Sequence, residues 1–176
     1  LEGYVHVVAT DEHDEDSTLI SDEFTNTHKR RQMVEKRARK FETILDDIAP
    51  PALEGPAEAD VTLIGWGSTH GMIVEAVDAL NAAGISTNNL QIKWIVPLHG
   101  GQIMETLSKA KRTIIVENNY SGQFARYLRS ETGFSADGHI RKYDGEPFMP
   151  HHIVDGVKAQ VGGETSKYVP YQEITV

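Results

Sequence analysis

Three glycines follow an apolar stretch of this chain, where many α/β proteins bind the phosphates of a cofactor. Gly65, Gly67 and Gly71 stand in the sequence TLIGWGSTHG. Their spacing is one residue longer than the dinucleotide fingerprint, and the next expected strand lacks the carboxylate that binds a ribose. No Gly-Lys-Ser/Thr follows, which excludes a P-loop. We favour a tight turn capped by Ser68, and anion binding by its free N–H groups remains the alternative.

A second polar group ends the sequence TIIVENN. Glu117, Asn118 and Asn119 would lie at the carboxyl edge of a parallel sheet, where such sheets place their ligands. Glu117 would act as a general base or accept hydrogen bonds from the neighbouring loop. No histidine stands at a spacing that marks a catalytic pair, so we favour the structural role and predict no catalytic residue. Glu117 and Asn118 remain candidates for contacts to a cofactor.

Eight histidines suggest a metal site, and the clusters are EHDED around His13 and the pair His151–His152. Neither contains two histidines four residues apart on a helix, the spacing that makes a zinc motif specific. We therefore predict no metal site. Because the chain has no cysteine, disulfides, thiolate ligands and cysteine nucleophiles are excluded, which is compatible with a cytoplasmic location.

Charge and hydropathy argue against nucleic acid as a partner and against a membrane helix. The formal net charge of −9 argues against nucleic-acid binding, which needs a basic surface. The basic run HKRRQMVEKRARK alternates with apolar residues three and four positions apart, so it predicts the solvated face of a helix that pairs with the acidic run 11–23 or with a partner. No apolar run reaches the roughly 20 residues of a membrane helix.

The elements that must position these groups alternate between strand and helix after residue 57. Three strand–helix units in succession imply a parallel sheet with helices on both faces, because parallel strands need crossover connections. We expect an acidic loop, a helix ending at Ile48 and a linker, then strands at 61–66, 90–97 and 112–119, helices at 73–80, 100–111 and 123–129, an edge strand near 139–143, and a helix from Pro150. The expected domains are residues 1–57, 58–162 and an arm, 163–176.

Several motifs together resemble a known family. They are an E-H-D-E loop, an M-V-E-K-R-x-R-K helix, a G-W-G-S turn, a P-L turn and a V-E-N-N strand end, in that order from Gly3 to about Lys158. The chain resembles the C-terminal part of the alpha subunit of 2-oxoacid:ferredoxin oxidoreductases, especially the 2-oxoglutarate type. A chain that starts at Leu1 in a strand pattern also suggests a piece of a longer protein.

The resemblance implies an oxidative decarboxylation on thiamine diphosphate, electron transfer through iron–sulfur clusters to ferredoxin, and acyl transfer to coenzyme A. It implies a domain similar to the transketolase C-terminal domain, a three-layer α/β/α sandwich around a mostly parallel, mixed sheet of about five strands. The cofactor pyrimidine would lie in the preceding domain, and the diphosphate and magnesium in the partner beta subunit. This chain would then be an assembly domain that binds no cofactor itself.

Two points stay open beside the resemblance. His13 matches the histidine of the family's acidic loop and is a candidate for the substrate channel, although we favour a role in stabilising the loop. After the E-H-D-E loop, where relatives usually have a glycine, this sequence has EDSTLISD. The competing functions are a stand-alone nucleotide- or CoA-binding module using Gly65–Gly71, and a nucleic-acid or protein adaptor using Lys29–Lys40.

Overall fold

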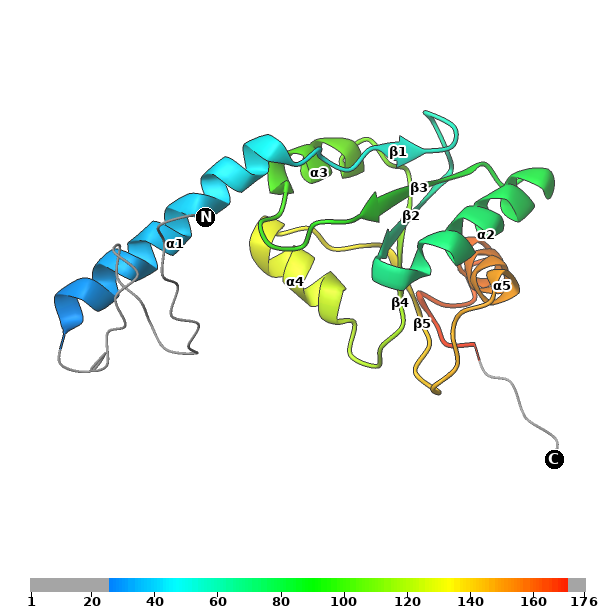
Figure 1. The fold of residues 1–176 in the computed structure, drawn as a ribbon. Helices are drawn as coiled ribbons and strands as arrows, with labels where there is room; N and C mark the ends of the chain where they lie inside the picture. Colours follow the sequence, from blue (N-terminus) through cyan, green and yellow to red (C-terminus); the bar gives the residue numbers. More distant parts are fainter. Residues whose placement is uncertain (1–25, 171–176) are drawn as a thin grey trace, which may run out of the picture. The chain divides into compact units, whose positions relative to one another are not determined.

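A computed structural model describes residues 26–170, which fall into two compact units that divide between Ala49 and Pro50 (Figure 1). In the first unit, helix α1 runs over Thr27–Asp47, and the Asn26 side chain caps it by accepting a hydrogen bond from Lys29 N at 3.1 Å. The three- and four-residue spacing of apolar residues therefore did mark a helix. The acidic loop and His13 lie outside the described residues.

The second unit is built on a six-stranded sheet in the order β1-β3-β2-β4-β5-β6. Only the pairing of β1 with β3 is antiparallel, so the sheet is mixed and mostly parallel. The strands are β1 (Leu53–Glu54), β2 (Val61–Trp66), β3 (Thr87–Ile92), β4 (Thr113–Glu117), β5 (Gly138–Arg141) and β6 (Lys167–Tyr168).

Helices cover both faces of the sheet and complete the expected three-layer sandwich (Figure 1). One face carries α2 (His70–Ala82) and α5 (Pro150–Val161), which pack with β2, β4 and β5 in one apolar core. The other carries α3 (Gly100–Leu107) and α4 (Gln123–Thr132), which pack on β2, β3 and β4 in a second core. The buried residues of α2 are Ile73, Ala76, Val77 and Leu80, the face that the sequence indicated.

The structure corrects two expected strands and adds two that were not expected. β3 begins at Thr87 and ends at Ile92, not at 90–97, because four of its six fully buried positions are polar and hide the strand from hydropathy. The strand near 139–143 is β5, and it is not an edge, since β6 pairs with it. β1 and β6 have two residues each, too short to leave a pattern.

Candidate functional site

The carboxyl ends of β2 and β4 form the topological switch point of the sheet. From β2 the chain crosses through α2 to β3 on one side, whereas from β4 it crosses through α4 to β5 on the other. Open α/β sheets bind ligands in the crevice outside the strand ends at this point. Both sequence candidates lie here, since Gly65 and Gly67 end β2 and Glu117 ends β4.

Gly65 serves the packing of α2 on the sheet. A Cβ at this position would overlap the side chains of Ile73 and Gln91. Gln91 Nε2 also donates a hydrogen bond to Gly67 O at 3.3 Å. Side chains therefore cover the backbone at Gly65, and the phosphates of a cofactor have no open approach to it. Gly67 has a φ of 58°, a left-handed conformation that favours glycine, and makes the turn into the helix.

The turn is not capped by Ser68, contrary to our expectation. A short 3₁₀ helix, η1 (Gly67–Thr69), leads into α2, and neither helix has a side-chain cap. The hydroxyl that bonds to the backbone belongs to Thr69, which donates to Trp66 O at 2.8 Å. Ser68 is exposed. The Ser68 hydroxyl therefore faces solvent, next to the start of α2, which no side chain caps.

Glu117 is fully buried, and its carboxylate is occupied by the fold. Oε2 accepts from Phe124 N at 2.8 Å and from Asn119 Nδ2 at 2.9 Å, and Oε1 accepts from Ala125 N at 3.1 Å. These bonds satisfy two of the N–H groups that the start of α4 leaves without a partner inside the helix. They also set the negative charge at the positive end of the helix dipole.

Asn119 completes the start of α4. Its Oδ1 accepts from Gly122 N at 2.7 Å and from Gln123 N at 3.1 Å. Four successive backbone N–H groups, from Gly122 to Ala125, are therefore bonded to Glu117 or Asn119. A helix start of this kind would otherwise attract an external anion. Here the chain's own side chains fill that site.

One hollow remains open at the switch point. It has a volume of about 190 Å³ and is lined by Trp66, Gly67, Ser68, Thr69 and Asn118. The structure thus brings Asn118, from the end of β4, to the glycine turn of β2. Ligand pockets for drug-sized molecules usually enclose about 300–1,000 Å³, so this hollow suits a small anion better than a dinucleotide.

Two residues near this edge were missed by sequence reasoning. In β5, His139 pairs with Ile115 and Arg141 pairs with Glu117 of β4. Burial, and then the nearby Arg141 guanidinium, lower the pKa of His139, and its Nδ1 is buried without a hydrogen-bond partner among the described residues. No motif contains these residues, and only the pairing of β5 with β4 brings them to the buried carboxylate.

Two further histidines have structural partners, and of these only His152 was singled out in the sequence. His152 Nδ1 accepts a hydrogen bond from Met149 N at 3.1 Å at the start of α5. His70 Nε2 lies 2.8 Å from Glu54 Oε2, and this bond is the main reason that the pKa of Glu54 is lowered. Within residues 26–170, no group of three histidines, cysteines or acids is placed to hold a metal ion.

Comparison with known proteins places the fold. Residues 52–140 match the family model described as the transketolase C-terminal domain. A similar solved structure is that of 2-oxoglutarate:ferredoxin oxidoreductase from Magnetococcus marinus, which has 2-oxoglutarate, coenzyme A and succinyl-CoA bound. It aligns with a TM-score of 0.72 and 29% sequence identity, over 89% of this chain and 27% of the Magnetococcus marinus chain. In the same described part of the chain, no helix is both long and apolar enough to span a membrane.

Curated relatives agree with the structural match. The alpha subunit of 2-oxoacid:ferredoxin oxidoreductase from Saccharolobus solfataricus is 32% identical over 86% of this chain, and subunit alpha of the Aeropyrum pernix oxidoreductase 2 is 34% identical over 73%. The alignments cover 24% and 21% of those relatives, so the chain spans about a quarter of their length. The chain belongs to the transketolase C-terminal domain family, in the form that makes up part of the alpha subunit of 2-oxoacid:ferredoxin oxidoreductases.

Proposed function

We propose that this chain is a non-catalytic assembly domain of a thiamine-diphosphate-dependent 2-oxoacid:ferredoxin oxidoreductase, and that the substrate is 2-oxoglutarate. The observation that supports the proposal is the structural role of the Glu117 carboxylate. Its carboxylate is buried and holds the start of α4, so it does not face a substrate. The choice of 2-oxoglutarate rests on the similar structure of the Magnetococcus marinus enzyme, which was solved with 2-oxoglutarate bound.

The part of the chain that the structure describes shows no site that fits the cofactors of such an enzyme. Thiamine diphosphate binds through a magnesium ion, whose preferred ligands are carboxylate and carbonyl oxygens. The open hollow at the switch point offers Ser68, Thr69 and Asn118 but no carboxylate. An iron–sulfur cluster needs thiolates, and the chain has no cysteine. We therefore assign thiamine diphosphate, magnesium and the cluster to other parts of the complex, with the beta subunit and ferredoxin as partners.

Exposed apolar side chains after the strand ends are suited to assembly. Trp94 and Val96, which follow β3, are 51% and 60% exposed, and Tyr120, which follows β4, is 68% exposed. Aromatic residues are enriched at the centres of protein interfaces. The division into residues 1–57, 58–162 and 163–176 belongs to the same proposal, as does the role of His13 in stabilising the acidic loop, with the substrate channel as the alternative.

The first test measures the melting temperature of this chain alone. Thiamine diphosphate with magnesium, coenzyme A and NAD are each added, because a ligand that binds only the folded state must raise the melting temperature. The assembly proposal expects no shift with any of them. A saturable shift that disappears in Gly67→Val would instead establish the competing function, a nucleotide or CoA module at the glycine turn.

The second test uses the assembled oxidoreductase. Trp94→Ser and Tyr120→Ser should leave the melting temperature of the chain within about 2 °C of the parent, since exposed positions contribute little to stability. They should weaken assembly in analytical ultracentrifugation, whereas Lys158→Ser on α5, away from the strand ends, should not. Normal assembly in both variants would contradict the proposed interface.

A further inference from the structure

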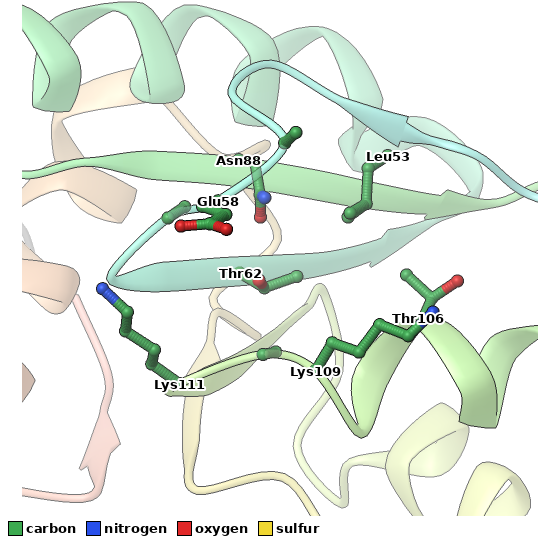
Figure 2. A pocket seen from close by; sticks show the side chains of 10 residues that line it. Leu53, Glu58, Thr62, Asn88, Thr106, Lys109 and Lys111 are labelled. Atoms are coloured by element: carbon green, nitrogen blue, oxygen red, sulfur yellow. The ribbon is translucent and has the colours of Figure 1, made fainter.

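A second hollow lies at the opposite, amino edge of the sheet (Figure 2). It has a volume of about 460 Å³ and lies between the segment that joins β1 to β2 and the end of α3. This volume falls within the range of about 300–1,000 Å³ that small-molecule pockets usually enclose. The hollow is separate from the switch point, because it adjoins Thr62 and Asn88 near the starts of β2 and β3.

Small apolar side chains leave the space open. Ala57 and Ala59 line it from the segment before β2, Ala110 lines it from the segment after α3, and Leu53 of β1 adds an aliphatic surface. Larger residues at the alanine positions would fill part of the volume. These side chains offer contact to an aliphatic group, and they provide no hydrogen bond that would fix its orientation.

Asn88 gives the hollow a buried acceptor. Its side chain is 2% exposed, and Nδ2 donates to Pro56 O at 2.9 Å, which holds the segment before β2. Oδ1 is buried and has no hydrogen-bond partner among residues 26–170. Buried polar atoms are nearly always bonded, so this oxygen calls for a donor that the protein does not supply. In Figure 2, Asn88 points from β3 toward Thr62, with the Glu58 carboxylate nearby.

Two lysines add positive charge, and in the same view Lys109 and Lys111 point in opposite directions along the hollow (Figure 2). Lys109 and Lys111 line the hollow with their stems, and their ammonium groups pair with Glu105 at 3.0 Å and Asp60 at 2.8 Å. All four side chains are more than 60% exposed. Exposed pairs of this kind are weak, and an ammonium group has three donors, so each lysine can also bond to a ligand carboxylate.

We propose that this pocket binds a free α-amino acid in its zwitterionic form. The ligand ammonium donates to Asn88 Oδ1 and to the Glu58 carboxylate, and the ligand carboxylate accepts from one of the two lysines, Lys109 or Lys111. The ligand side chain packs against the alanines. A simple anion would meet Glu58 and the unpaired amide oxygen, and a simple cation would meet the lysines, so a molecule that carries both charges matches the lining best. The site is independent of the assembly function proposed above.

The test records amide NMR spectra of the full chain with each standard amino acid at about 10 mM, well above the dissociation constant of about 1 mM expected for about ten ligand atoms of ordinary efficiency. At least one amino acid should give saturable shifts centred on residues 57–62 and 109–111. Its N-acetyl and carboxamide derivatives each lack one charge and should bind at least tenfold more weakly.

Variants at exposed positions keep the fold intact. Ala57→Leu fills the mouth of the pocket and should abolish the shifts. Ala52→Leu, at an exposed position just before β1 that does not line the pocket, should leave them unchanged. Glu58→Gln should weaken binding several-fold. The proposal is overturned if no amino acid gives saturable shifts, if both derivatives bind as well as the parent ligand, or if Ala57→Leu leaves binding unchanged.

Discussion

Replacing Glu117 by glutamine tests whether its carboxylate holds the start of α4. The new amide group would place an NH₂ against either Ala125 N or Phe124 N, so at least one buried N–H loses its acceptor. A buried unsatisfied group costs about 1–3 kcal/mol. The lost charge at a helix start adds about 0.3–1 kcal/mol. Glu117→Gln should therefore lower the free energy of unfolding by about 1–4 kcal/mol.

Tryptophan fluorescence during urea unfolding is a suitable assay. Both tryptophans of the chain, Trp66 and Trp94, lie in the second unit, and Trp66 stacks on Phe124 of α4 with ring centroids 5.6 Å apart. Glu131→Gln, at an exposed position of the same helix, is the matched control and should change stability by less than about 0.5 kcal/mol. A Glu117→Gln variant as stable as this control would refute the structural role and return Glu117 to the list of candidate bases.

Three further predictions concern packing and pH. Gly65→Ala should cost about 1–3 kcal/mol in urea unfolding through overpacking, whereas Gly71→Ala, with open space around its Cβ, should not destabilise. The pKa of His139 is lowered in the folded chain, so the unfolded chain binds the proton more tightly and the free energy of unfolding should fall as pH drops below about 6.5. His139→Gln should make the free energy of unfolding depend less steeply on pH, and an unchanged dependence would contradict this prediction. His70→Ala should raise the pKa of Glu54 in an NMR titration, because the bond that lowers it is lost.

The pattern of apolar residues in the sequence predicted those strands and helices whose buried positions are mostly apolar. β2 is apolar except for Thr62 and was placed at its observed bounds, and the inner face of α2 was identified at each of its four buried positions. β3 shows the limit of this reasoning. Asn88 and Asn89 are buried with side-chain partners distant in sequence, because Pro56 O accepts from Asn88 and Glu54 Oε2 accepts from Asn89. Hydropathy alone cannot indicate such partners.

The candidate site was predictable only in part, for a similar reason. The sequence placed Glu117 and the glycine turn at the same edge of the sheet, since both follow parallel strands. It did not indicate that Thr69 rather than Ser68 bonds to the turn, because both hydroxyls precede the helix and only the backbone geometry separates them. Arg141 and His139 reach this edge through the register of β5 against β4, which no local pattern fixes.

The arrangement at the switch point explains how a nucleotide-binding architecture can lack an open nucleotide site. Phosphate sites of this fold need an accessible glycine turn and free N–H groups at a helix start. Here side chains cover the backbone at Gly65, and Glu117 and Asn119 take the N–H groups of α4, so of these two helix starts only that of α2 has no side-chain cap. Both changes stabilise the packing of helices on the sheet at the expense of ligand access. The edge then retains a small hollow and exposed aromatic residues, features that suit contact with another protein surface better than a dinucleotide.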